Sequence, residues 1–340
     1  MKSSKTHFNT LDGLRGILAI AVVIHHYSMH FELKWMNNAW VAVDIFFIIS
    51  GFVITHSYER RITEGESFYN FMYRRLNRLY PMFLFAVILS VIGFYLFTTT
   101  PNTILIEKAL LSSFALPYYG SDTTSITATN ISSAVYPLND PAWSLFFEFF
   151  VSAIFFYAIF FLKTMKIKIT FFILTSILYF IAVYNYGPHP GWSKHNFLGG
   201  FPRVIFYFFI GYFLYHIYRK FNNGHSLVFA TLLVMYIISF NIQYWNLVYI
   251  LLALSPILVL SATKSKFFEN TTFSKPIFLI GAISYPLYIT HFVLILYLDN
   301  LFDFNEYTPE TKLIFYTFIA ILMATIFTQS EIYIRKALRN

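Results

Sequence analysis

Residues 11–31 read LDGLRGILAIAVVIHHYSMHF, a stretch long enough to cross a bilayer as one helix although it carries Asp12, Arg15, His25 and His26. Ionisable side chains are costly to bury in a membrane span, so they indicate function. At about 100° per residue, Arg15 and His26 lie about 20° apart around the helix and roughly 16 Å apart along it, whereas His25 points elsewhere. Each alone is also typical of a snorkelling arginine or a hydrogen-bonded core histidine. Their shared face favours a site.

The composition indicates a polytopic α-helical membrane protein. The 340 residues are 57% hydrophobic and 12% charged, whereas soluble domains carry about 25% charged residues. Because cysteine is absent from the sequence, disulfides, thiolate metal sites and a cysteine acyl-enzyme are excluded. The net charge of +8 is typical of basic cytoplasmic loops that set membrane orientation, and we expect no nucleic-acid partner.

Hydropathy and loop charge predict an all-α bundle of about ten transmembrane helices, a single domain over residues 1–340, with both termini cytoplasmic. The predicted spans are 11–31, 40–57, 81–98, 140–162, 169–186, 201–218, 225–242, 247–262, 276–298 and 312–332. Pro81 is expected to open the third span, since proline is tolerated in the first helical turn. Residues 104–118 are too short and polar to cross, which predicts a re-entrant, interfacial or buried segment. The polar N-terminus shows no cleavable signal peptide, so we expect the first span to be retained.

The most basic segment, residues 59–80, precedes the third span. Apolar residues recur in it at helical spacing with Arg75 and Arg78 on another face, which predicts an amphipathic interfacial helix. Such a helix is either an anchor at the lipid headgroups or a binding site for an anionic ligand such as a diphosphate.

Other predicted spans also carry polar groups. In the second span Asp44 is ionisable, and the small residues Ser50 and Gly51 permit close helix packing. In the span 140–162, Trp143 marks the outer interface, and Ser144 and Glu148 share one face. A carboxylate among phenylalanines needs a partner or a proton.

The span 276–298 contains Pro286, which predicts a kink, and places Ser284, Tyr288 and His291 on one stripe. His189 and His195 lie in a Gly/Pro loop without metal-ligand spacing, so we interpret them as surface histidines and expect no metal.

The polar groups are predicted to gather at two depths. The cytoplasmic group comprises Arg15, Arg75 and Arg78, and the outer group comprises His26, Asp44, Glu148, Arg203 and His291. This pattern is typical of an enzyme that holds an anionic donor at the inner face. A proton-coupled transporter or flippase for saccharide or acyl cargo would use the same groups as a relay. A silent sensor or scaffold would not need the histidines and Glu148.

Five motifs in order resemble the membrane acyltransferase-3 family of integral-membrane O-acyltransferases. They are LDGLRGILAIAVVIHH with Arg15 and His26, VDIFFIISGFVI, FMYRRLNRLYP with Arg75 and Arg78, AWSLFFEFF with Trp143, Ser144 and Glu148, and ISYPLYITHF with Ser284, Tyr285, Tyr288 and His291. The ten-span core of the family agrees with the predicted count. Some members carry an additional extracellular hydrolase-like domain, and because this sequence ends at Asn340 we expect transfer to be completed in the membrane domain.

The resemblance implies transfer of an acetyl or other acyl group, usually from acetyl-CoA, to a hydroxyl of a cell-envelope glycan or lipid-linked saccharide. It also implies an integral protein of the bacterial inner membrane, in contact with membrane lipids. For the donor, Arg15, Arg75 and Arg78 are the expected ligands of the CoA phosphates, because the planar arginine fork suits phosphate oxygens.

The same resemblance suggests roles in the chemistry. His26 is expected to act as general base, since a neutral imidazole suits proton abstraction near neutral pH, with Glu148 or Asp44 to orient it. The oxyanion donor is His291 or Tyr288. Trp143, Ser144 and Tyr288 are the expected acceptor-binding residues. In an alternative mechanism His26 itself carries the acyl group covalently.

Overall fold

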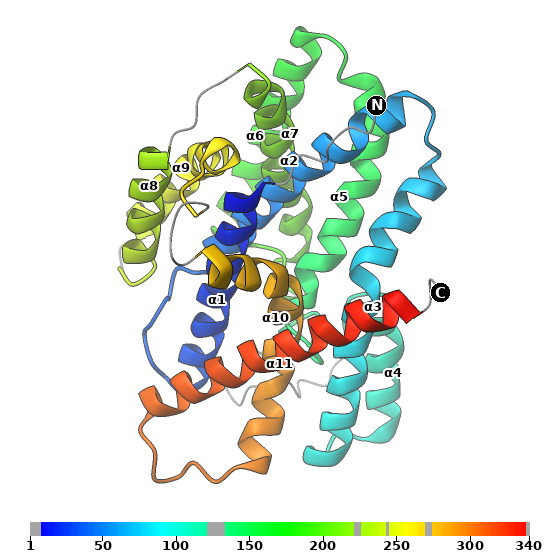
Figure 1. Ribbon diagram of the computed structural model, residues 1–340. Helices are drawn as coiled ribbons and strands as arrows, with labels where there is room; N and C mark the ends of the chain where they lie inside the picture. Colours follow the sequence, from blue (N-terminus) through cyan, green and yellow to red (C-terminus); the bar gives the residue numbers. More distant parts are fainter. Residues whose placement is uncertain (1–7, 121–132, 221–225, 243–244, 269–273, 338–340) are drawn as a thin grey trace.

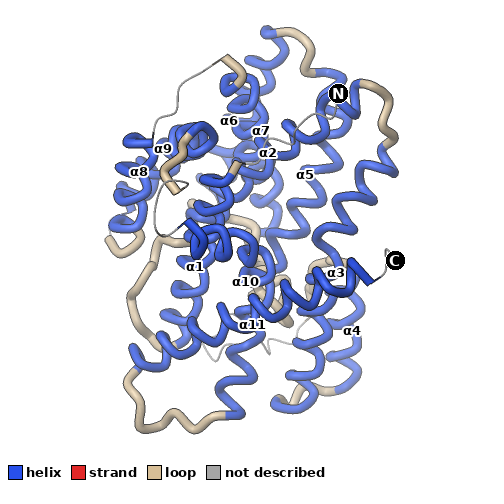
Figure 2. The backbone as a smooth tube through the Cα atoms, in the orientation of Figure 1, coloured by secondary structure: helices blue, strands red, loops and turns tan. Residues whose placement is uncertain are grey.

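The computed structural model describes residues 8–120, 133–220, 226–242, 245–268 and 274–337 (Figure 1). Helices dominate this part of the chain, which has no β-strand beyond an isolated bridge between Ala134 and Ser193 (Figure 2). The helices are α1 (Asn9–His30), α2 (Val41–Thr63), α3 (Phe68–Phe97), α4 (Asn102–Ser113), α5 (Ala142–Phe161), α6 (Met165–Tyr186), the 3-10 helix η1 (Phe197–Gly199), α7 (Gly200–Tyr218), α8 (Ser226–Ser239), α9 (Trp245–Lys264), α10 (Ser274–Leu301) and α11 (Pro309–Ala337). The predicted all-α membrane bundle is confirmed.

Seven helical segments of the described chain are long and apolar enough to cross a membrane. They belong to α2, α3, α5, α6, η1–α7, α10 and α11. The ten predicted crossings would need α1, α8 and α9 as well, and α8 has only 14 residues. The count of ten therefore stays a prediction, as does the cytoplasmic side of the termini, because residues 1–7 and 338–340 lie outside the described residues.

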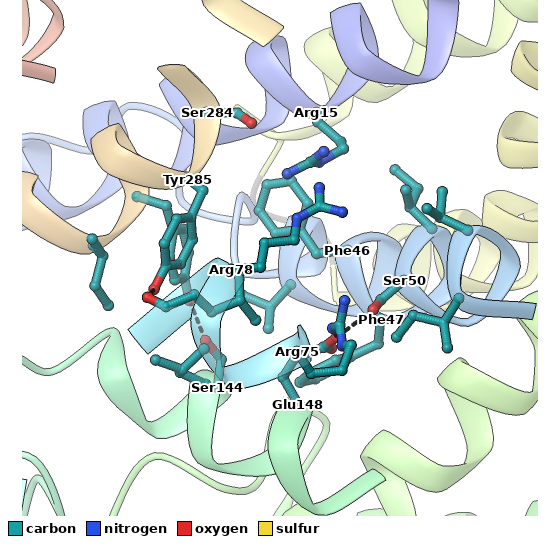
Figure 3. A pocket seen from close by; sticks show the side chains of 18 residues that line it. Arg15, Phe46, Phe47, Ser50, Arg75, Arg78, Ser144, Glu148, Ser284 and Tyr285 are labelled. Carbon is teal, nitrogen blue, oxygen red and sulfur yellow. Dashed lines mark hydrogen bonds and ion pairs between the residues drawn. The ribbon is translucent and has the colours of Figure 1, made fainter. Parts of the chain in front are cut away.

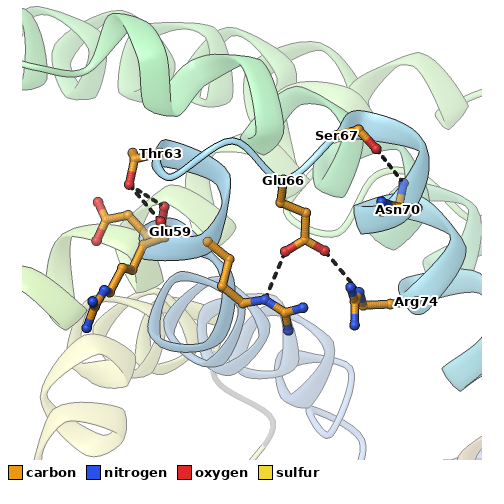
Figure 4. A network of polar contacts seen from close by, with 8 residues as sticks. Glu59, Thr63, Glu66, Ser67, Asn70 and Arg74 are labelled. Atoms are coloured by element: carbon orange, nitrogen blue, oxygen red, sulfur yellow. Dashed lines mark hydrogen bonds and ion pairs between the residues drawn. The ribbon is translucent and has the colours of Figure 1, made fainter.

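The structure corrects the boundary expected at Pro81. One helix of 30 residues, α3, runs from Phe68 to Phe97 with Pro81 inside it, and it begins where Ser67 Oγ accepts a hydrogen bond from the Asn70 amide (Figure 4). A proline in a helix removes one backbone hydrogen bond, a loss that packing against neighbouring membrane helices offsets. Residues 68–80 of the basic segment and the third span therefore form one continuous helix, whereas residues 59–63 belong to α2.

Between α2 and α3, a charged clamp fixes the turn. The Glu66 carboxylate accepts a hydrogen bond from Arg74 Nε at 3.0 Å and forms an ion pair with Arg61, whose Nε lies 2.9 Å from the other carboxylate oxygen (Figure 4). Its side chain is 7% exposed, so these contacts are shielded from water better than an ordinary surface pair. Glu66 holds Arg74, whereas Arg75, the next residue of α3, is buried in the bundle.

The segment predicted not to cross forms α4, a helix of 12 residues that packs against α3. At about 1.5 Å per residue it is roughly 18 Å long, too short for a bilayer core of about 30 Å. Its Lys108 is buried with Nζ over the rings of Phe94 and Tyr118. The prediction of a packed, non-crossing segment agrees with this placement.

Glycines permit close crossings of α2 with α7 and of α1 with α10. A Cβ built on Gly211 of α7 would lie 2.0 Å from the Ile48 carbonyl oxygen of α2, and one on Gly51 would lie 1.9 Å from the Phe208 oxygen. Between α1 and α10, a Cβ on Gly281 would lie 2.7 Å from the Asp12 oxygen. These contacts confirm the close packing expected at Gly51, and they bring the polar residues of each helix pair together.

Candidate functional site

Two cavities lie toward opposite ends of α1. The first, which we call the arginine cavity, has a volume of about 150 Å³ and its polar lining includes Arg15, Ser50, Arg75, Arg78 and Glu148. The second, which we call the histidine cavity, has a volume of about 570 Å³ and its polar lining includes His25, His26, Asp140, His189 and Arg203. Arg15 therefore lines the arginine cavity and His26 lines the histidine cavity.

Guanidinium groups from two helices converge in the arginine cavity (Figure 3). Arg75 donates to the Glu148 carboxylate, which also accepts a hydrogen bond from Ser50. Arg15 is 3.4 Å from the Asp12 carboxylate, while Arg78 has no hydrogen-bond or ion-pair partner among the described residues. Glu148 and Asp12 offset two of the three guanidinium charges, so one positive charge remains uncompensated and the cavity favours an anion.

Arg75 carries a further sign that a ligand belongs here. Its Nε atom is buried and has no hydrogen-bond partner in the described part of the chain. Buried donors in folded proteins are nearly always satisfied, so an unmet donor beside two other guanidiniums indicates a missing acceptor. Phosphate oxygens have this chemistry.

In the histidine cavity, His26 forms a hydrogen-bonded pair with His291. His26 Nδ1 lies 2.9 Å from His291 Nε2, and His291 Nδ1 lies 3.1 Å from the Leu287 carbonyl oxygen. A carbonyl oxygen only accepts, so His291 Nδ1 carries the proton and its Nε2 is an acceptor. His26 therefore donates through Nδ1, which leaves the lone pair of His26 Nε2 unused by the protein. His26 thus has one unprotonated ring nitrogen in the cavity that it lines.

The structure gives Asp44 a partner other than His26. The Asp44 carboxylate accepts hydrogen bonds from Arg203 Nε at 2.7 Å and Arg203 Nη2 at 3.1 Å. Both side chains are buried, and Arg203 also donates to the Pro190 carbonyl and lies 5.3 Å from the Trp143 ring centroid. A buried bidentate pair of this kind fixes α2 against α7. The imidazole of His26 is oriented by His291 instead.

Glu148 also lies elsewhere than the sequence analysis expected. It was grouped with the outer histidines, whereas the structure pairs it with Arg75 in the arginine cavity. The reason is electrostatic, because a carboxylate among phenylalanines needs a cation and Arg75 is the one that α3 brings to it. Sequence spacing within one span does not reveal such a partner.

Tyr288 and Val43 line both cavities and form the partition between them. The Tyr288 hydroxyl lies 2.9 Å from Ser144 Oγ, and Ser144 itself donates to the Pro141 carbonyl at 2.9 Å. Ser144 lines the arginine cavity and Trp143 the histidine cavity, so consecutive residues of α5 face opposite sides of the partition. A hydroxyl thus stands where the cavities meet.

Two polar residues of the histidine cavity were missed by sequence reasoning. His189 was interpreted as a surface residue, but it is half-buried against Trp40, and burial lowers its pKa to about 4. Asp140 directly precedes the Trp143 motif, and burial raises its pKa to about 7. His195 is exposed, as predicted. In the described ranges, no group of three or more His, Asp or Glu could hold a metal ion.

Comparisons with known proteins place this geometry in context. Residues 8–329 match a family model described as an acyltransferase domain. The chain is 32% identical to "Protein 2 in picA locus" of Rhizobium radiobacter over 162 residues, which covers 45% of this chain and 83% of that protein. It is 26% identical to the "O-acetyltransferase OatA" of Staphylococcus aureus strain NCTC 8325, covering 93% of this chain and 54% of the relative.

A third relative is the "Peptidoglycan O-acetyltransferase OatA" of Listeria monocytogenes, 31% identical over 91 residues, or 26% of this chain and 14% of that protein. The chain therefore spans about half the length of its Staphylococcus aureus relative. No solved structure matches it significantly.

Proposed function

The chain belongs to the acyltransferase family that its residues 8–329 match, and on that premise we propose that it is a membrane O-acetyltransferase. The donor is acetyl-CoA, which binds with its phosphates in the arginine cavity on the cytoplasmic side. The acceptor is a hydroxyl of a cell-envelope glycan or lipid-linked saccharide in the histidine cavity on the outer side. The membrane is the bacterial inner membrane.

The observation that carries this proposal is the opposition of the two cavities across one partition. The arginine cavity offers guanidiniums to phosphates, and the histidine cavity offers a free imidazole nitrogen to a hydroxyl. Arg15 and His26 stand roughly 16 Å apart along α1, a span comparable to an extended pantetheine arm. The smaller arginine cavity suits that narrow arm, and the larger histidine cavity suits a sugar.

The proposed reaction begins at His26. Its Nε2 takes the proton of the acceptor hydroxyl while the hydroxyl oxygen attacks the thioester carbonyl. The tetrahedral intermediate collapses with cleavage of the carbon–sulfur bond, and the thiolate of CoA takes the proton back from the imidazolium of His26. His291 keeps His26 in the correct tautomer throughout. Because both nitrogens of His291 are engaged, Tyr288 is the better oxyanion donor of the two candidates.

His26→Ala tests the central residue, with His195→Ala as the matched control because His195 is an exposed histidine outside the cavity. We expect His26→Ala to abolish acetyl transfer and His195→Ala to retain it. His26→Gln adds a sharper comparison, since an amide can still donate to His291 but has no basic lone pair. Mass spectrometry of envelope glycans from cells with and without each variant reads out one acetyl mass. Normal acetylation in His26→Gln would contradict the base role.

The donor site is tested by Arg78→Ala against Arg74→Ala. Arg78 faces the arginine cavity, whereas Arg74 is held by Glu66 in the clamp outside it. Loss of a charge-assisted phosphate contact of about 1.5–3 kcal/mol weakens CoA binding roughly 10- to 100-fold. We expect that loss in calorimetric titration of Arg78→Ala only. Equal affinity of both variants for CoA would contradict the assignment.

A further inference from the structure

Asp140 stands in the loop before α5 and lines the histidine cavity. The residue is 8% exposed, its Oδ1 atom is buried, and the carboxyl group has no hydrogen-bond partner among the described residues. Burying a carboxylate without a partner is costly, so such groups are rare outside binding sites. Asp140 has no part in the proton transfer assigned to His26. We infer that a ligand in the cavity donates a hydrogen bond to the Asp140 carboxyl group.

The charge balance of the cavity leaves Asp140 uncompensated. Arg203 is the cation on the same wall, but its guanidinium is held by both oxygens of Asp44. His189 is uncharged at neutral pH because burial lowers its pKa to about 4, and its Nδ1 atom is also buried without a partner in the described chain. An anionic ligand would thus meet an unpaired carboxylate, which disfavours it.

The remaining walls are aromatic. Trp40, Trp143 and Trp192 line the cavity, and the ring of His189 contacts Trp40 edge-on at 4.6 Å between centroids. Indole rings offer flat apolar faces with a polar edge, a combination that suits the C–H faces and hydroxyl rims of a hexose. A volume of about 570 Å³ admits a ligand of that size.

We propose that the histidine cavity selects an uncharged saccharide, a hexose or N-acetylhexosamine unit, and that Asp140 determines this specificity. Its carboxylate accepts hydrogen bonds from two hydroxyls of the sugar that the indoles hold, and it repels acidic sugars such as uronates. This inference rests on the proposed function and adds the class of acceptor to it. Asp140 is a specificity residue, since it contacts the sugar but exchanges no proton with it.

Binding is tested on the purified full chain in detergent by quenching of tryptophan fluorescence. The probes are chitopentaose, a neutral oligosaccharide, and pentagalacturonate, an acidic one. At pH 8, where Asp140 is ionised because its pKa is about 7, we expect wild type to bind chitopentaose and to reject the uronate. Asp140→Asn should weaken chitopentaose binding about 10-fold, from the loss of one charged acceptor, and should gain uronate binding. Asp303→Asn is the matched control, because Asp303 is an exposed acid of the loop before α11.

Two outcomes overturn the proposal: wild type binds both probes equally, or Asp140→Asn binds them as wild type does. Trp35→Phe should leave the fluorescence quenching by chitopentaose unchanged, since Trp35 is 42% exposed and outside the cavity lining. This variant therefore checks that the quenching comes from the tryptophans of the cavity. Failure of the proposed function looks different. In that case chitopentaose still quenches fluorescence and Asp140→Asn still shifts the preference, but no acetyl reaches any saccharide from acetyl-CoA.

Discussion

Removal of Asp44 tests whether this residue holds the bundle together or takes part in the chemistry. Arg203 and Asp44 are 1% and 0% exposed in their side chains, and two hydrogen bonds of 2.7 and 3.1 Å join them. In Asp44→Ala the guanidinium keeps the Pro190 carbonyl and the Trp143 ring but loses its counter-charge. Leaving one buried charge unpaired costs about 3–5 kcal/mol, so we expect that loss in the free energy of unfolding.

The pair of charges, by contrast, contributes little net stability. A double variant, Asp44→Leu with Arg203→Met, removes both charges while it keeps most of the volume. Replacing a buried ion pair by apolar residues is often neutral or stabilising, so we expect the double variant to recover most of the stability that Asp44→Ala loses. Unfolding in detergent, followed by circular dichroism during titration with denaturant, measures all three proteins. The structural role of the pair is refuted if the free energy of unfolding of Asp44→Ala lies within about 1 kcal/mol of that of wild type. It is also refuted if the double variant is no more stable than Asp44→Ala.

Three further predictions concern Gly211, Asp140 and Tyr288. Gly211→Val places a Cβ 2.0 Å from the Ile48 oxygen, so α2 and α7 must separate, and we expect a lower melting temperature; an unchanged one contradicts the crossing. Burial raises the pKa of Asp140 from 3.8 to about 7, so wild type loses stability as pH rises between those values and stays less stable above them. Asp140→Asn should abolish that slope and be more stable by ~4 kcal/mol at pH 8, whereas equal unfolding curves at pH 5 and pH 8 for wild type would refute it. Tyr288→Phe should lower kcat about 100-fold with an unchanged Kd for CoA, and a normal kcat would exclude the oxyanion role.

Local periodicity predicted what one helix decides. The angle and rise of an α-helix placed Arg15 and His26 on one face at different depths, and the structure puts them in cavities at either end. The small residue Gly51 predicted a close crossing that α7 makes. These features depend only on the spacing of residues along one helix, so they can be predicted from the sequence.

Pairings between distant helices were beyond the sequence. Glu148 and Asp44 were expected beside His26, but each is bound to an arginine from a helix far along the chain. Which cation meets which carboxylate is decided by helix packing, so one sequence leaves the choice open. The histidine partner of His26 was present in the late motif, yet only the fold shows that it is the orienting group.

Loops and prolines account for the remaining differences. Asp140 and His189 lie in connecting segments without periodicity, where no pattern separates a cavity wall from a solvent-facing turn. Pro81 was expected to begin a helix, but in a packed bundle one lost hydrogen bond does not end it.

The central claim is that the donor and the acceptor meet from opposite sides of the membrane. It is tested most directly in sealed proteoliposomes, with radiolabelled acetyl-CoA supplied on one side of the membrane and chitopentaose on the other. We expect labelled sugar only when acetyl-CoA is on the side of Arg78 and the sugar on the side of His26, and none with His26→Gln. Transfer only when both substrates share one compartment would contradict the account.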